Sequence, residues 1–274
     1  MAEPQSLFDA TIRLLDPLDD LFLAITLASL RLYAAFTVLP PMGEQFVQGF
    51  VRAGVVFIIA TFSAFGLPAD EGTHLGAGEW FGYALKESMI GLLLGYAAST
   101  VFWVAESVGA LLDAQTGFNN AQMSNPLSGE QSTPVSNLLS TLMVAVFFQL
   151  GGMLVFISAV FESFSAWPLF SAMPQMSAMP DLFIVRQTDS MMTSVVKFAA
   201  PVLLVLVLID LGFGLITRAA EKLEPGNLSQ PVKGAVTMLL LALLVGVMLT
   251  EVRQLLLPTG LLAQLKSSLG VARP

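Results

Sequence analysis

The sequence predicts an all-α, polytopic membrane protein of about six hydrophobic helices arranged as packed helical hairpins. Hydrophobic residues make up 55% of the 274 residues and charged residues only 12%. The mean hydropathy of +0.77 is too high for a water-soluble domain. Windows of about 20 mostly apolar residues, the length of helix that crosses a bilayer, recur along the chain.

Six such windows are the expected spans, at residues 21–39, 47–65, 83–104, 138–161, 195–216 and 232–256. Pro40 and Pro41 end the first span, because proline has no N–H for the helical ladder, and they predict a hairpin of the first two spans. The helical pattern of the third span continues to Asp113, and Gly117 is expected to end it.

The composition divides the chain into six parts. They are an acidic N-terminal segment at 1–20, three helices at 21–115, a loop rich in Gly, Asn, Ser and Pro at 116–136, a fourth helix with a loop rich in Pro and Met at 137–190, a C-terminal helical hairpin at 191–257 and a tail at 258–274. Acidic residues before the first span are the reverse of a cleaved secretory signal, so we expect that span to be retained. The loop at 116–136 is long for a connection between two apolar helices.

Several function classes are excluded by composition. The chain has no cysteine, one histidine and a net charge of −8. Zinc sites built from Cys and His, disulfides and Cys- or His-based catalytic groups therefore cannot be assembled within it. The acidic balance offers no basic surface for nucleic acid, and no phosphate-binding GxxxxGK[ST] motif occurs. We expect no enzyme activity, no metal, no cofactor and no nucleic-acid partner.

Charged side chains inside the expected spans are candidates for function, because each costs roughly 2.5 to 3.5 kcal/mol on insertion. Arg31 and Asp210 are the intramembrane charges of most interest. Two interpretations stay open: an ion or proton path, or pairing between helices, which is the commoner role. The whole set is Arg31, Lys86, Glu87, Glu106, Asp113, Glu162, Lys197, Asp210 and Glu251.

A stripe of carboxylates and small residues follows one face of the extended third helix. Its members are Glu106, Gly109, Ala110, Asp113 and Gly117. The two carboxylates lie two turns, or about 10 Å, apart, which is too far for a dyad that shares a proton. The stripe fits close packing against a partner or a water-filled passage. Close packing is also expected at Gly91 with Gly95, and Gly151 with Gly152 permits close packing or a bend.

An ordered series of motifs along nearly the whole chain resembles one known family. The motifs are Arg31 to Pro40, Val51 to Ala53, Phe102 to Gly109, Asp113 to Gly117, Phe147 to Gly152, Ala200 to Leu204, Gly214 to Arg218 and Ser229 to Lys233. They are similar to the T component of the type III secretion export apparatus, the SctT family, which is homologous to flagellar FliR. The pattern Asp113-x-Gln115-x-Gly117 favours the injectisome branch. The chain departs from the family after Arg218, where Glu221-Lys222 replaces a usual Pro-Gln pair.

The resemblance implies a structural subunit of an export gate in the bacterial inner membrane. The subunit would form a protein-conducting passage with the R, S and U components, and this core would be raised towards the periplasm. The passage would carry unfolded polypeptide substrates.

The resemblance also implies roles for particular residues. The loop after the third helix is the family's plug, here Gly117, Phe118, Asn119, Asn120, Met123 and Pro126. Glu106, Gly109, Asp113 and Gln115 would support the plug-bearing helix. Arg218, Lys222, Ser229, Pro231 and Lys233 would contact the cytoplasmic base. The alternative is an autonomous secondary transporter, suggested by Arg31, Asp113 and Asp210 in apolar surroundings.

Overall fold

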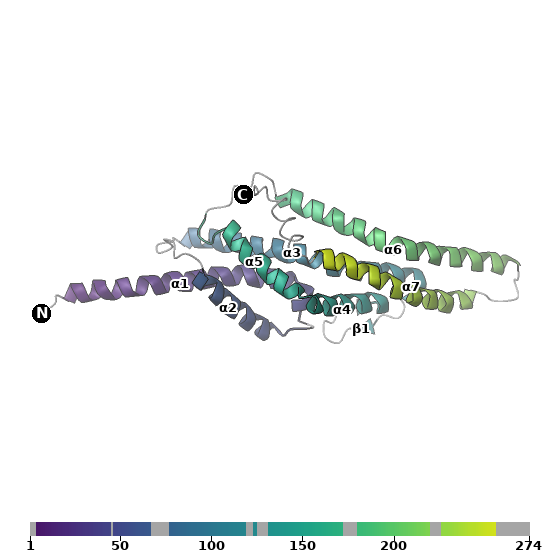
Figure 1. The fold of residues 1–274 in the computed structure, drawn as a ribbon, viewed down its shortest axis with the longest axis horizontal. Coiled ribbons are helices and arrows are strands. Elements are labelled where there is room, and N and C mark those ends of the chain that lie inside the picture. The colour runs from purple at the N-terminus through teal and green to yellow at the C-terminus, as the bar shows by residue number, and fades with distance from the viewer. Residues whose placement is uncertain are drawn as a thin grey trace. The chain divides into compact units, whose positions relative to one another are not determined.

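The computed structural model describes residues 4–44, 46–66, 77–118, 123–124, 131–171, 180–219 and 226–255, and these are almost entirely helical (Figure 1). The elements in chain order are α1 (Pro4–Val38), the 3-10 helix η1 (Pro40–Met42), α2 (Gly49–Gly66), α3 (Ala77–Thr116), β1 (Met123–Ser124), β2 (Gln131–Ser132), α4 (Pro134–Gln149), α5 (Gly152–Ala166), α6 (Pro180–Ala219) and α7 (Gly226–Leu255). The two strands pair with each other and are two residues long each.

Within the described residues, five helical segments are long and apolar enough to cross a membrane. They are Asp20–Val38, Gly49–Gly66, Gly78–Thr116, Phe183–Ala219 and Ser229–Thr250. The bent pair of α4 and α5 provides a sixth span if it is counted as one. The predicted fold class, an all-α polytopic membrane protein, is confirmed.

The fourth expected span differs most from the structure. The sequence predicts one helix over residues 138–161, whereas α4 ends at Gln149 and α5 begins at Gly152, with a bend of 70° between them. Gly151 has a φ of +73°, a left-handed conformation that ends the first helix. At Gly152, a Cβ would overlap the ring of Phe147, whereas at Gly151 it would meet nothing within 4 Å. Gly151 is thus needed for backbone conformation and Gly152 for close approach.

Two helices begin earlier than hydropathy suggests. α1 begins at Pro4, inside the predicted acidic segment, and α6 begins at Pro180, inside the predicted loop rich in Pro and Met. Proline in the first turn of a helix loses no intrahelical hydrogen bond, so it permits both starts. The methionines at 173, 176 and 179, which belong to that loop, lie outside the described residues.

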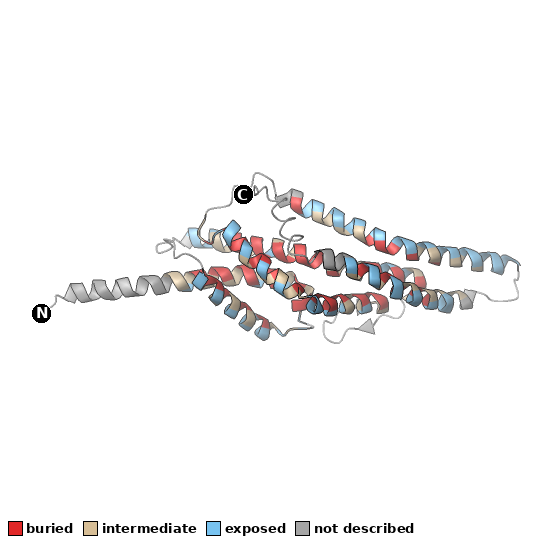
Figure 2. Cartoon of the chain, viewed as in Figure 1, coloured by how far each residue is buried: buried red, intermediate tan, exposed pale blue. Residues whose placement is uncertain are grey.

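The chain divides into two compact units, which are described separately. The described part of the first lies within residues 4–98 and 156–180, and the described part of the second lies within residues 99–155 and 181–255. In the first unit, α1 packs against α2. Gly91 and Gly95 of α3 lie against the backbone of α1, where an added Cβ would overlap the carbonyl oxygens of Arg31 and Ala35. Figure 2 shows the resulting buried residues along α1 and α3.

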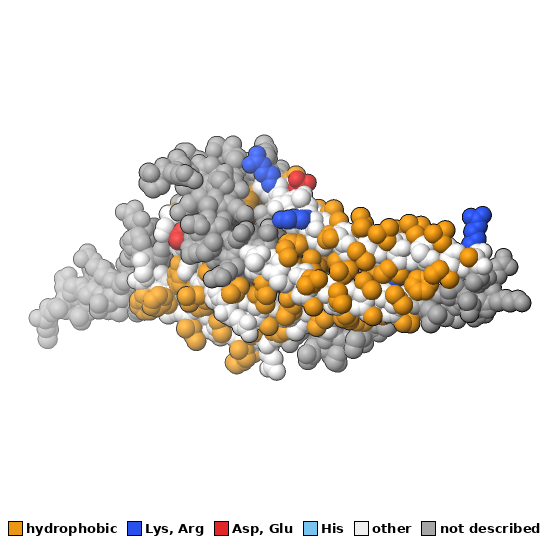
Figure 3. Space-filling model, turned by 45° about the vertical axis from the view of Figure 1, so that its right-hand side comes forward, with side chains coloured by type: hydrophobic (Ala, Val, Ile, Leu, Met, Phe, Trp, Pro, Cys, Tyr) orange, Lys and Arg blue, Asp and Glu red, His pale blue; other side chains and the backbone are white. Residues whose placement is uncertain are grey.

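In the second unit, the C-terminal part of α3 packs against α4. A Cβ at Gly109 would overlap the backbone of Ser136, so the two helices are in close contact there. Phe102 and Phe147 pack edge to face with ring centroids 5.2 Å apart. Much of α6 and α7 is exposed and apolar, and apolar side chains are spread over much of the described part of the face seen in Figure 3. Such surfaces suit lipid or partner subunits rather than water.

Candidate functional site at the ends of the α3–α4 loop

The C-terminal end of α3 is set by Gly117. Its φ of +84° is the left-handed conformation that glycine adopts without strain, and its N–H donates to the carbonyl oxygen of Asp113 at 3.1 Å. The Thr116 hydroxyl donates to the carbonyl oxygen of Leu112 at 2.9 Å. These bonds close the last turn, and α3 ends at Thr116, immediately before Gly117, the residue that the sequence predicts as its end.

Asp113 ties the end of α3 to the beginning of α4. Its Oδ2 accepts hydrogen bonds from the N–H groups of Val135 at 2.9 Å and Ser136 at 3.0 Å, and the side chain is fully buried. The N-cap residue of α4, Thr133, makes no side-chain capping bond. The carboxylate of Asp113 therefore caps α4 from another helix, where negative charge is favourable.

A second bond strengthens this junction. The Ser136 hydroxyl donates to the carbonyl oxygen of Glu106 at 3.0 Å. Together with the close approach at Gly109, it fixes the spacing of α3 and α4 over two turns of α3. The stripe predicted from the sequence thus faces α4 at Gly109 and Asp113.

The loop between α3 and α4 turns back on itself as a short antiparallel ladder. Met123 pairs with Ser132, and Ser124 pairs with Gln131. Of the six predicted plug residues, Gly117 and Phe118 have described side-chain surroundings and Met123 lies in β1. Asn119, Asn120 and Pro126 lie outside the described residues.

Lys233 of α7 connects the end of α3 to α6. Its Nζ lies 2.9 Å from Oδ1 of Asp210 and donates to the carbonyl oxygen of Gln115 at 3.0 Å. The Gln115 side chain completes the group, since its Nε2 donates to Oδ2 of Asp210 at 3.0 Å. Three predictions that the sequence made separately, for Gln115, Asp210 and Lys233, thus fall on one cluster.

Two further contacts join α7 to the residues that follow α3. Gln230 Nε2 donates to the carbonyl oxygen of Gly117 at 3.2 Å. Gly234 lies under the ring of Phe118, and a Cβ there would be 2.8 Å from Cζ of that ring. Sequence reasoning missed Gln230 and Gly234, because neither is charged and no spacing relates α7 to the end of α3.

The remaining residues of the predicted base contact are more dispersed. Arg218 lies exposed in the last turn of α6, and Pro231 is exposed on α7. Ser229 is half-buried on α7, and Lys222 lies outside the described residues. Their contact with a cytoplasmic base stays a prediction.

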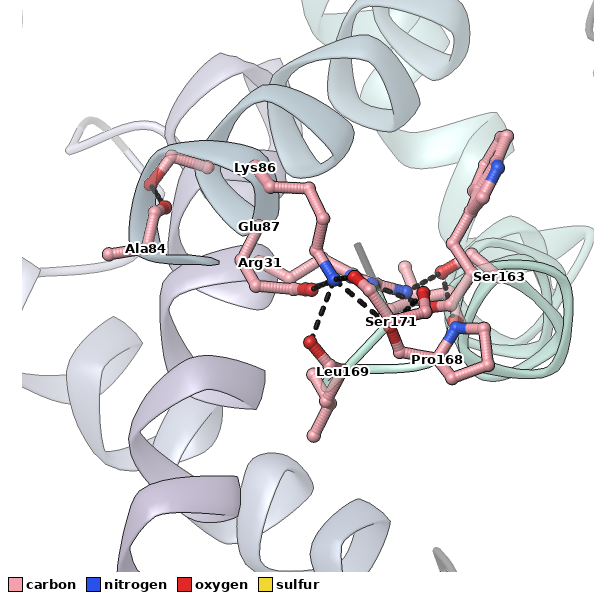
Figure 4. A network of polar contacts seen from close by, with 11 residues as sticks. Arg31, Ala84, Lys86, Glu87, Ser163, Pro168, Leu169 and Ser171 are labelled. Atoms are coloured by element: carbon pink, nitrogen blue, oxygen red, sulfur yellow. Dashed lines mark hydrogen bonds and ion pairs between the residues drawn. The ribbon is translucent and has the colours of Figure 1, made fainter. Parts of the chain in front are cut away.

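Arg31 belongs to a separate, buried charge cluster in the first unit (Figure 4). Its Nε lies 2.5 Å from Oε2 of Glu87, and its other nitrogens donate to the Ser163 hydroxyl and the Trp167 carbonyl, each at 2.9 Å. The guanidinium also lies 4.2 Å from the ring centroid of Phe164. All three guanidinium nitrogens therefore have partners.

Lys86, next to Glu87 on α3, is the second cation of this cluster. Its Nζ lies 3.0 Å from Oε1 of Glu87. It also donates to the carbonyl oxygens of Pro168 at 3.0 Å, Leu169 at 2.7 Å and Ser171 at 3.1 Å. One carboxylate therefore serves two buried cations, and both cations bind the segment that follows α5.

The two intramembrane charges are thus paired between helices, Arg31 with Glu87 and Asp210 with Lys233. This arrangement favours the pairing interpretation over an ion path. Glu87 lies 56 residues from Arg31, so no sequence pattern indicated which acid would be its partner. Among the described residues, no group of three or more His, Cys, Asp or Glu side chains is placed to hold a metal ion.

Comparison with known proteins agrees with the resemblance seen in the sequence. Residues 22–258 match the family described as bacterial export proteins, family 1. The chain is 30% identical to the Yop proteins translocation protein T of Yersinia pestis over 81% of this chain and 85% of that protein. It is 26% identical to the flagellar biosynthetic protein FliR of Bacillus subtilis, over 85% and 90% of the two chains. The surface presentation of antigens protein SpaR of Shigella flexneri is 24% identical, over 74% and 77%.

Proposed function

The chain belongs to the family of bacterial export proteins, family 1, and from this premise we propose that it is the T component of a type III export gate. As a member of this family it is a structural component of a secretion apparatus and not an enzyme. It is a multi-pass membrane protein. In the proposed role it lines the protein-conducting passage together with the R, S and U components in the bacterial inner membrane, in a core raised towards the periplasm.

The proposed plug is the α3–α4 loop. The observation that carries this assignment is the double capping by Asp113, which holds the two ends of an irregular loop together without involving the loop's own side chains. The loop is then free to occupy a passage while its base stays fixed. Phe118 and Met123 supply apolar and conformable surface for closing a narrow pore, and Gly117 provides a turn.

The injectisome branch is the proposed setting. The 30% identity to the translocation protein T supports this branch. The substrates would be unfolded polypeptides. The tip between α6 and α7, with Arg218 and Lys222, would contact the U component, whereas Lys233 Nζ is already engaged with Asp210 and Gln115.

Co-purification tests the export-gate role. The tagged chain is co-expressed with the R and S components of the same genome, purified and imaged. We expect a stable complex in which this chain closes the ring. If the chain purifies alone as a monodisperse folded protein while R and S assemble with each other, the proposed function is wrong.

A conductance measurement tests the plug. The double variant Phe118→Gly with Met123→Gly should assemble normally and make the closed gate leak small ions. The matched control is Phe50→Gly, which changes a phenylalanine of α2 that is 90% exposed. Unchanged conductance in the assembled double variant would defeat the plug assignment.

The alternative, an autonomous secondary transporter, loses the observation that suggested it. Arg31 and Asp210 are paired with opposite charges, and Oδ2 of Asp113 caps α4. Solute flux through the isolated, reconstituted chain would revive that alternative.

A further inference from the structure

The α3–α4 loop is held by two kinds of contact that differ in solvent exposure. The Asp113 cap joins α3 to α4, and its side chain is fully buried. The contacts of Lys233 join the end of α3 to α6 and α7, where the side chain of Lys233 is 12% exposed and that of Asp210 is 39% exposed. The contacts of Lys233 and Asp210 are therefore partly open at the surface of the chain, whereas the Asp113 cap is enclosed by the chain.

Three residues on one face of α7 contact the last turn of α3 and the two residues that follow Thr116. Gln230, Lys233 and Gly234 lie three and four positions apart, which places them on the same side of a helix. They contact the Gly117 carbonyl, the Gln115 carbonyl and the Phe118 ring, respectively. We call Gln230, Lys233 and Gly234 the α7 latch.

The charge of Lys233 suits this position for a general reason. The last carbonyl groups of a helix have no intrahelical donor and carry the negative end of the helix dipole. Lys233 donates to the carbonyl of Gln115 from a positively charged ammonium. Gln230 donates to the carbonyl of Gly117 from a neutral amide. Asp210 orients the ammonium group and also accepts from the Gln115 side chain.

We propose that Lys233 is a positioning residue, and that the α7 latch holds the plug-bearing end of α3 in the closed gate and releases it on opening. The Asp113 cap stays intact during opening, so the loop moves with α3 and α4 while its contacts to α7 break. This inference rests on the proposed function. It adds the element that keeps the plug in place.

The test measures ion conductance of the purified complex of this chain with the R and S components. Lys233→Met removes the ammonium donor. Because the closed gate contains this charge-assisted hydrogen bond and the open gate does not, its loss should raise the open fraction, and with it the leak, about tenfold. Lys233→Arg keeps a positive donor and should stay close to the unmodified gate. Lys197→Met, which removes a lysine from the exposed side of α6, is the matched control and should not leak.

A charge exchange separates a latch on α3 from a simple ion pair. In the double variant Asp210→Lys with Lys233→Asp, the two charges are still opposite, but the carboxylate at position 233 faces the Gln115 carbonyl and cannot donate to it. We therefore expect this variant to leak as Lys233→Met does. A tightly closed exchange variant would mean that only the ion pair matters, and the inference would be wrong.

The variant Met123→Gly separates failure of this inference from failure of the proposed function, because Met123 is a proposed plug residue that none of the three latch contacts involves. If Met123→Gly leaks and Lys233→Met does not, the latch is wrong and the plug stands. If neither leaks, both are wrong. If Lys233→Met does not assemble, Gln230→Ala decides, because it removes a neutral donor of the same latch: a leaking complex supports the latch and a tightly closed one overturns it.

Discussion

Replacing Glu87 by leucine should destabilise the fold more than any other single change to the Arg31 cluster. Glu87 is the only carboxylate that the described contacts place against Arg31 and Lys86, at 2.5 and 3.0 Å, and its side chain is fully buried. Without it, Arg31 at 0% exposure and Lys86 at 5% remain as buried cations with no counter-ion. Removing one partner of a buried ion pair is costly for this reason.

The loss of unfolding free energy in Glu87→Leu depends on the contacts that Arg31 and Lys86 keep. Breaking a buried pair costs about 3 to 5 kcal/mol. Arg31 keeps the Ser163 hydroxyl and the Trp167 carbonyl, and Lys86 keeps three carbonyl oxygens. These acceptors solvate the stranded charges, so the lower end of the range, about 3 kcal/mol, is expected for Glu87→Leu.

A double-mutant cycle measures the coupling directly. Arg31→Met combined with Glu87→Leu removes the Arg31–Glu87 pair completely, whereas Lys86 still loses its carboxylate and keeps only its three carbonyl acceptors. Because Arg31 is no longer left as a buried cation, the losses of the two single variants should be less than additive in the double variant, by about 1 to 2 kcal/mol. The assay is the free energy of unfolding in mixed detergent micelles, measured by denaturing-detergent titration.

The matched control is Glu79→Leu, which changes an exposed glutamate on the same helix. It should lose far less stability than Glu87→Leu. The reasoning is refuted if the two variants are equally stable, or if the losses of Arg31→Met and Glu87→Leu simply add in the double variant.

Three further changes have expected outcomes. Asp113→Leu should lose about 1 to 2 kcal/mol of stability with the α4 cap, and it should impair assembly or secretion; a fully active, fully stable variant would show that the carboxylate is dispensable. Gly109→Val should separate α3 from α4, because a Cβ at position 109 overlaps Ser136, and the yield of the complex with R and S should fall. The control is Gly54→Val, where a Cβ meets nothing within 4 Å and the yield should not change. Gly151→Ala should cost about 1 kcal/mol for the left-handed conformation, measured as a lower thermal stability; an unchanged midpoint would contradict this.

Hydropathy predicted the ends of the first and third spans well. Pro40 and Pro41 end the first hairpin segment as predicted, and α3 ends at Thr116, immediately before Gly117. The break within residues 138–161 was missed, although Gly151 and Gly152 lie at it. Glycine inside an apolar helix serves close packing as often as bending, and the sequence does not separate these uses.

The sequence predicted several residues of the candidate site, but it did not predict which residues they contact. Asp113 and Gln115 were singled out from the stripe and the resemblance, and Asp210 from its apolar surroundings. Their partners came from Val135 and Lys233, which are 22 and 118 residues away from the α3 atoms that they contact. Such pairings depend on how helices dock, which is a tertiary property that periodicity along one helix does not encode.

The two ends of the α3–α4 loop explain how irregular backbone can exist between two apolar helices. In lipid, an unpaired backbone N–H or C=O costs several kcal/mol, so non-helical backbone is tolerated only where protein or water satisfies it. At α4 the N–H groups of Val135 and Ser136 are satisfied by a carboxylate, and at α3 the carbonyls of Gln115 and Gly117 are satisfied by an ammonium and an amide. The carboxylate at the start of α4 and the ammonium at the end of α3 each carry the charge that their helix end favours. The side chains that satisfy these ends therefore remove this cost at the four backbone groups named.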